Sequence, residues 1–170
     1  MRSVLTVLGV LLAALAGSIA LRDKPFGIER FWTLVFGPPD LGPVDFTRLV
    51  RRTSPNDALV CPPGFCGGSR VDVAAPVFAM SAHDLRDKIR SLALAEPGAV
   101  QVAEAASGKG DRYVVRTPLM RYPDTVDVLV LPQPEGKATV ALYSRSQIGR
   151  SDLGANLARL KRWLAALGAG

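Results

Sequence analysis

Hydrophobic residues near the end of the chain recur at the spacing of an α-helix. Leu153, Leu157, Leu160, Leu164 and Leu167 are separated by steps of four and three residues, which places all five on one helix face. Burial of each leucine contributes roughly 1.5–3 kcal/mol, so the stripe contributes on the order of 10 kcal/mol as an upper value. The pattern predicts a closing amphipathic helix that packs on a sheet.

Alternating apolar residues and turn residues predict that sheet between residues 71 and 144. Pro76 favours an edge position for the first strand. A capping box at Ser81 and Asp84 predicts a helix that Pro97 ends. Four further strands follow at short intervals, so the order β-α-β-β-β-β-α indicates an α+β domain: an antiparallel sheet of about five strands with two helices on one face, preceded by an N-terminal hydrophobic helix. The expected strands are residues 71–79, 99–105, 112–122, 125–131 and 138–144, with a tight turn at Pro123-Asp124.

Pairing the last two strands about Pro134 sorts their side chains by sheet face. Apolar residues then lie under the helices, whereas Asp127, Tyr143 and Arg145 share the opposite face. A slip of one residue would reverse the two faces. The apolar set is Val126, Val128, Val130, Ala138, Val140 and Leu142.

Residues 4–21 are apolar apart from Thr6, Ser18 and glycines, with Arg2 before them and Arg22 and Lys24 after them. This length is marginal for a membrane span of about 20 residues and long for a signal-peptide core. A retained anchor is favoured over a cleaved signal, and a buried core helix is the third interpretation. Either of the first two places the remaining chain on the extracytoplasmic side of a membrane.

The predicted organisation is an anchor or signal at residues 1–24, a Pro/Gly-rich linker at 25–70 and the α+β domain at 71–170. Within the linker, residues 31–36 (FWTLVF) are apolar but too short to cross a bilayer. They could lie at the membrane interface or pack on the domain. Residues 37–43 (GPPDLGP) predict a stiff spacer leading away from the membrane, and residues 45–52 a short helix.

Cys61 and Cys66 are the two cysteines of the chain and flank a Pro-Pro-Gly turn. In an oxidising compartment this spacing favours a structural disulfide. A redox pair would usually be spaced C-x-x-C at a helix start. A structural metal site would need four ligands, and His83 is the single histidine. No metal or cofactor is therefore expected.

The net charge of +6 indicates a preference for anionic partners. The basic residues are scattered and aromatic residues make up 6% of the chain, so the stacking platforms typical of nucleic-acid binding are missing from the sequence. Anionic lipid headgroups or an acidic envelope polymer fit this pattern better.

No motif defines a reaction. Ser81, His83 and Asp84 together suggest a hydrolase, but they lie on one helical turn and no G-x-S-x-G elbow is present. Asp127 has no second carboxylate that would suggest a glycosidase. A non-enzymatic protein is the expectation.

Residues 143–156 (YSRSQIGRSDLGAN) resemble the closing signature of the domain-of-unknown-function 1499 family, which reads S-R-x-G-x-x-D-x-G-x-N-x-x-R. Residues 37–45, 54–56 and 121–127 match further stretches, so the resemblance covers residues 37–167. The chain departs from the signature at residues 146–149, which are one residue longer before Gly149. The resemblance implies bacterial envelope or plastid proteins, often with an N-terminal membrane segment, and no established activity.

The polar residues around this signature have two interpretations. In the first, Ser151 caps the closing helix and the helix dipole stabilises the charge of Asp152. Arg145 and Arg150 then pair with Asp127 and Asp152. In the second, the helix N-terminus and the two arginines bind a phosphate or carboxylate. The candidate anion-binding residues are Asp127, Tyr143, Arg145, Arg150, Ser151, Asp152 and Asn156.

Taken together, these patterns predict a membrane-tethered, exported module of the bacterial cell envelope that binds a lipid-like or anionic ligand. The alternatives are a protein-interaction scaffold with an unknown partner and, last, a hydrolase of unknown substrate. No nucleic acid is expected as a partner.

Overall fold

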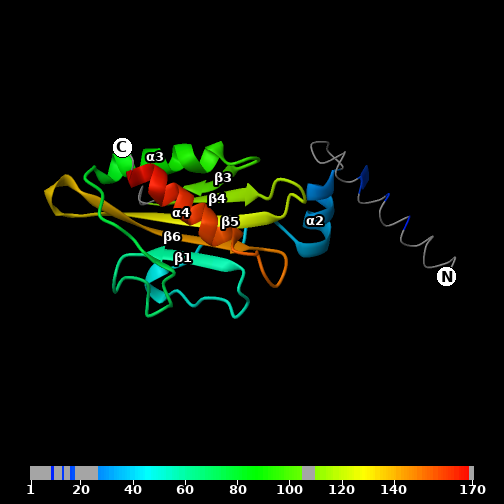
Figure 1. Cartoon of the computed structure of the whole chain (residues 1–170), viewed down its shortest axis with the longest axis horizontal. Coiled ribbons are helices and arrows are strands. Elements are labelled where there is room, and N and C mark those ends of the chain that lie inside the picture. The colour runs from blue at the N-terminus through cyan, green and yellow to red at the C-terminus, as the bar shows by residue number, and fades with distance from the viewer. Residues whose placement is uncertain (1–8, 10–12, 14–15, 18–26, 105–109, 169–170) are drawn as a thin grey trace.

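The computed structural model describes residues 9, 13, 16–17, 27–104 and 110–168. Six strands form one sheet in the order β2-β1-β6-β5-β4-β3, and helices α3 and α4 cross the same face of it (Figure 1). The elements are α2 (Ile28–Phe36), η1 (Phe46–Arg48), β1 (Asp57–Cys61), β2 (Val73–Ala74), α3 (Ala82–Ala95), β3 (Val100–Glu104), β4 (Gly110–Arg116), β5 (Pro123–Pro132), η2 (Pro134–Gly136), β6 (Ala138–Ser146) and α4 (Ala155–Gly168).

The hydrophobic helix predicted before the domain falls almost entirely on residues outside the described ranges. Among the residues that are described, no helix combines the length and the hydropathy needed to cross a membrane.

The α+β class is confirmed, but the prediction of an antiparallel sheet was wrong. Strand β1 is parallel to β2, where Val60 lies opposite Val73. It is antiparallel to β6, where Asp57 lies opposite Arg145. The sheet is therefore mixed. The sequence pattern missed β1 because its five residues lie in a region dominated by prolines and glycines, and because its pairing partner β6 is far away in the chain.

The predicted sheet faces of the β5–β6 hairpin are confirmed, but its register was wrong by two residues. Pairing about Pro134 would place Val128 opposite Val140, whereas the strands pair about residue 135. A shift of two residues leaves the faces unchanged. Val128 lies opposite Leu142 and Val130 opposite Val140, whereas Asp127 lies opposite Tyr143. The valines belong to the core under α3 and α4. Because side chains alternate along a strand, Asp127, Tyr143 and Arg145 lie on the other face.

Helix α3 matches its prediction closely. The Ser81 hydroxyl accepts a hydrogen bond from the Asp84 N–H at 3.1 Å. Leu85 and Ile89 are buried against the sheet. The helix ends at Ala95, two residues before Pro97.

Helix α4 begins later than the leucine stripe predicted. Leu153 precedes the helix, has φ 53° and is 96% exposed. Leu160, Trp163 and Leu167 are buried under the helix, so the apolar face includes a tryptophan and excludes the first leucine. Leu157 and Leu164 are half-buried at its margin.

Two strands are shorter than their patterns suggested. Strand β2 covers Val73–Ala74. Strand β4 ends at Arg116 because residues 117–122 form a closed turn, in which the Thr117 N–H donates to the Tyr122 carbonyl at 3.0 Å. Pro123 and Asp124, predicted as the turn, are instead the first residues of β5.

The second face of the sheet is covered by irregular chain rather than by helices. Residues 37–43 contain no helix or strand, as predicted, but they lie against the sheet. The Leu41 N–H donates to the Thr125 hydroxyl at 3.0 Å, and Arg112 donates to Asp40 at 2.7 Å. The predicted helix at residues 45–52 is reduced to η1. A second apolar cluster forms beneath this cover, from Phe46, Leu49, Leu59, Cys61, Cys66, Ala141 and Tyr143.

Helix α2 packs on the domain through one side. The Trp32 indole N–H donates to the Met120 carbonyl at 2.7 Å, and its ring lies 5.0 Å from that of Tyr122. Glu29 pairs with Arg116 at 3.1 Å and with Arg121 at 2.6 Å. The packing alternative for residues 31–36 is therefore confirmed for this side, while the other side stays exposed.

The predicted disulfide between Cys61 and Cys66 is confirmed. We expect replacement of both cysteines by serine to lower the free energy of unfolding by about 2 kcal/mol, because the short loop is no longer closed in the unfolded chain. Urea denaturation of the variant and of the oxidised parent measures the difference. Reduction of the parent should produce the same loss, and a variant as stable as the oxidised parent would contradict the prediction.

Candidate functional site

The structure divides the predicted anion-site residues between two faces of the sheet. Asp152 and Asn156 lie at the start of α4 on the helix face. Arg145 lies on the opposite face, where it donates to Asp127 at 3.0 Å and to the Gly42 carbonyl at 2.5 Å. Of the two predicted ion pairs, that of Arg145 with Asp127 is confirmed. Arg150 and Ser151 are exposed in the loop before α4.

A buried hydrogen-bond network joins α4 to β5 and β6 on the helix face. The Arg159 guanidinium donates to Asp124 at 2.7 Å, to Ser144 at 2.9 Å and to the Asn156 side-chain carbonyl at 2.8 Å. The Ser146 hydroxyl donates to the other oxygen of Asp124 at 2.6 Å. All five residues are at most 5% exposed, so the network is a structural joint, inaccessible to a ligand.

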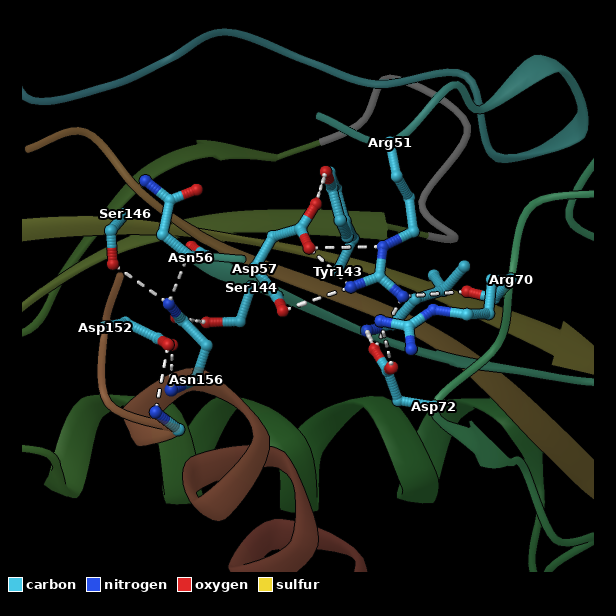
Figure 2. Close-up of polar contacts among 12 residues, drawn as sticks. Arg51, Asn56, Asp57, Arg70, Asp72, Tyr143, Ser144, Ser146, Asp152 and Asn156 are labelled. Carbon is cyan, nitrogen blue, oxygen red and sulfur yellow. Dashed lines mark hydrogen bonds and ion pairs between the residues drawn. The ribbon is translucent and has the colours of Figure 1, made fainter. Parts of the chain in front are cut away.

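The same network holds the start of β1 in place. The Asn156 amide donates to the Asn56 carbonyl at 3.1 Å, and the Asn56 amide donates to the Gly149 carbonyl at 2.7 Å. Figure 2 shows Asn156, which belongs to the first turn of α4, between Asn56, Ser144 and Ser146. Three segments that are distant in sequence therefore meet at one asparagine.

Asp152, rather than Ser151, caps α4. Its carboxylate accepts from the Gly154 N–H at 3.0 Å and from the Asn156 N–H at 2.8 Å. The Ser151 hydroxyl instead accepts from the Leu153 N–H, which precedes the helix, at 3.2 Å. A carboxylate at the helix N-terminus already satisfies the dipole there, so the first turn of α4 is not itself open to an anion.

On the opposite face, burial dominates the electrostatics of Asp127. Burial raises the pKa of this carboxyl to about 6, although the Arg145 and Arg112 guanidinium groups act in the other direction. The Arg145 guanidinium also lies 5.5 Å from the centre of the Tyr143 ring. These residues fix the covering segment to the sheet through Gly42 and Asp40.

A second polar cluster adjoins the first network across β1. Arg51 pairs with Asp57 and, at 2.7 Å, with Asp72. The Tyr143 hydroxyl donates to the second Asp57 oxygen at 2.5 Å. Figure 2 shows Arg51 between the two aspartates, with Arg70 beside Asp72. Burial, together with the Asp57 carboxylate, raises the pKa of Tyr143 above its usual value, so this hydroxyl stays a hydrogen-bond donor.

An open groove of about 930 Å³ runs along this cluster between three loops. Residues 49–57 form one wall, residues 67–72 a second, and the turn before α4 the third. Two exposed aliphatic side chains, Val50 and Leu153, stand in its lining. The charged lining residues are Arg51, Arg52, Arg70, Asp57, Asp72 and Asp152.

The acidic residues of the groove are already engaged, whereas two arginines have donors to spare. Asp57 and Asp72 bind Arg51, and Asp152 caps α4. Arg52 uses one guanidinium nitrogen on the Ser146 carbonyl at 3.0 Å, and exposed Arg70 lies 3.3 Å from Asp72. Since a guanidinium carries five N–H donors, Arg52 and Arg70 can bind a further acceptor.

His83 lies outside this region. Its side chain is 82% exposed on the first turn of α3, near Asp84 and Asp87 of the same helix. The Ser81 hydroxyl donates to Asp84 at 2.7 Å and accepts its N–H. The three residues thus serve the start of α3, and no nucleophile–base contact is formed among them.

Sequence reasoning missed the groove because it lies mostly in the segment interpreted as a linker. Arg51, Asp57 and Arg70 have no local pattern that indicates their convergence. A signal for β1 was present in the short apolar run of residues 58–60 after Asn56. Arg159 stood in the final N-x-x-R of the family signature without a role assigned to it.

A family model described as protein of unknown function (DUF1499) matches residues 69–167. The resemblance of residues 143–156 to this family is thereby confirmed, although the match begins later than residue 37. Neither a curated protein nor a solved structure gives a match to the chain.

Proposed function

We propose that the chain, which belongs to the DUF1499 family of proteins of unknown function, is a membrane-tethered binding module of the cell envelope. Its ligand is an anionic, lipid-like molecule held in the groove beside β1. The observation that carries the proposal is the pair of arginines, Arg52 and Arg70, that line an open groove whose carboxylates already bind Arg51 or cap α4.

The extracytoplasmic location is supported by two independent features. The Cys61–Cys66 disulfide is typical of oxidising compartments outside the cytoplasm. The apolar run at residues 4–21, followed by Arg22 and Lys24, has the composition of an anchor or export signal.

The ligand class follows from the mixed character of the groove. Guanidinium groups bind phosphate and carboxylate through paired, charge-assisted hydrogen bonds. Val50 and Leu153 offer aliphatic contact in the same lining. An anionic headgroup with an attached acyl chain matches both, whereas a small inorganic anion would leave the aliphatic side chains in water.

The test is native mass spectrometry of the full-length protein released from its own membranes. We expect a bound amphiphile in the parent and its loss in an Arg52→Ala/Arg70→Ala variant. Each charge-assisted hydrogen bond contributes about 1.5–3 kcal/mol, so each arginine should weaken binding by roughly 10- to 100-fold.

The matched control is Arg48→Ala/Lys161→Ala, which removes two exposed cations outside the groove lining. It keeps the net-charge change of the first variant, so a ligand held by general electrostatic attraction would be lost from both. Retention in the control and loss in the groove variant support the proposal. A parent that is empty, and stays empty when offered anionic lipids, contradicts it.

A further inference from the structure

Three loops and helix α2 lie together at one end of the sheet. The strand register fixes this placement, because Arg116 pairs with Pro123 and Asp57 with Arg145. Loops 49–56, 117–122 and 147–154 therefore leave the sheet at the same end. Helix α2 is attached there through Trp32 to Met120 and through Gln147, which donates to the Phe36 carbonyl at 3.0 Å. Figure 1 shows α2 at this end.

Large apolar side chains project into solvent from this end. Leu34 of α2 is 84% exposed, Leu119 is 59% exposed and Leu153 is 96% exposed. Leu153 has φ 53°, a left-handed conformation that leucine rarely adopts. Single exposed apolar residues are ordinary, but a set gathered from separate segments marks an interaction surface. We call this set the end surface; its members are Phe31, Leu34, Val35, Phe36, Val50, Leu119 and Leu153.

The chain itself indicates what covers the end surface. The apolar run ends at Leu21 and α2 begins at Ile28. Seven residue steps span at most about 25 Å, so a run inserted in a bilayer keeps α2 within that distance of it. Exposed Phe31 and Phe36 of α2, beside such a run, suit the interfacial layer. Exposed Arg52 and Arg150 at the same end suit anionic headgroups.

We propose that the end surface is seated on the lipid bilayer, with the outward side of α2 in the interfacial layer. The inference rests on the membrane tether of the proposed function. It adds an orientation: Val50 and Leu153 belong both to the end surface and to the groove lining. The groove therefore opens at the bilayer, and its ligand enters from the headgroup layer rather than from the aqueous phase.

Depth-sensitive fluorescent labels test this orientation in the full-length chain. Leu34→Cys, Leu119→Cys and Leu153→Cys each provide one reactive thiol, since the two native cysteines are joined in a disulfide. The labelled proteins are placed in nanodiscs of phosphatidylethanolamine and phosphatidylglycerol. The control is Val77→Cys, which is similarly exposed at 57% but lies at the opposite end of the sheet, beside the bridge of Phe78 to Ala138.

We expect quenching by aqueous iodide to be several-fold weaker at the three end-surface positions than at position 77, and quenching by a lipid-chain quencher to be stronger. Equal iodide quenching at all four positions would overturn the inference. Protection at position 34 alone would also overturn it, because α2 would then touch the bilayer without the domain end. If the protein does not insert into nanodiscs, the proposed tether is wrong, and this orientation is wrong with it. If the labels are protected but the groove holds no ligand, the seating of the end surface on the bilayer is supported and the proposed ligand is contradicted.

Discussion

Replacement of Asp124 by alanine is expected to lower the free energy of unfolding by about 3–5 kcal/mol, because it leaves a buried guanidinium without its counter-charge. Asp124 is 1% exposed and Arg159 is 5% exposed, and they are joined at 2.7 Å. The same substitution also leaves the Ser146 hydroxyl without its acceptor. A loss of this size is a large part of the total stability of about 5–15 kcal/mol that single domains possess.

The control for this prediction lies one turn further along α4. Arg162 also pairs with a carboxylate, Glu96, at 2.9 Å, but its side chain is 60% exposed. Arg162→Ala should therefore cost at most about 1 kcal/mol. Urea denaturation of both variants, followed by circular dichroism, measures the two losses. Comparable small losses would mean that water enters the joint and that the network does not hold α4.

A double variant separates the charge from the packing. Asp124→Ala/Arg159→Ala removes both members of the buried pair, so no uncompensated charge is left. Its loss should be smaller than the sum of the two single losses, as expected for residues in direct contact. Simple additivity would contradict the pairing seen between β5 and α4.

The parts of the fold that the sequence could predict are those set by local pattern. The capping box of α3 and the alternation of β5 and β6 each act within a few residues, so the helix start and the sheet faces follow from them. The register depends on the turn, which is centred one residue beyond Pro134. The same logic placed Asp127, Tyr143 and Arg145 on one face, which the structure confirms. Their chemistry could not be derived, because the covering segment that buries them comes from residues 37–52.

The elements that were missed depend on distant partners. Strand β1 gains its identity by pairing with β6, and β2 is held by main-chain bonds to Leu59 and Cys61. The groove is built from the loops around these two strands, so it was hidden with them. Leu153 was assigned to the helix by spacing alone, but the cap formed by Asp152 starts α4 two residues later.

The joint and the groove are connected through two adjacent residues, Asn56 just before β1 and Asp57 at its start. The Asn56 carbonyl accepts from the Asn156 amide on the helix face, and the neighbouring Asp57 carboxylate accepts from Tyr143 and Arg51 on the other. The joint therefore sets the position of one groove wall relative to the turn before α4. In this arrangement the closing signature of the family supplies rigidity, while the proposed binding groups come from residues 49–72.

The second large effect is expected from pH. Asp127 is 5% exposed, and its pKa is raised from 3.8 to about 6. The folded protein therefore holds this proton more tightly than the unfolded chain does. The resulting stabilisation is fully present below pH 3.8 and is lost as the pH rises through about 6. The difference in pKa corresponds to about 3 kcal/mol.

Asp127→Asn isolates this contribution, because asparagine keeps the shape and still offers an oxygen to Arg145 but does not titrate. Urea denaturation of the parent and the variant at intervals from pH 3 to 7 gives the difference between their free energies of unfolding. As the pH rises across this interval, the parent should lose about 3 kcal/mol of stability relative to the variant. The opposite slope, with the parent gaining stability as the pH rises from 3 to 5, would mean that the ion pair at 3.0 Å with Arg145 outweighs burial. The sign of the slope thus decides whether burial or the ion pair with Arg145 sets the charge of Asp127 beneath the covering segment.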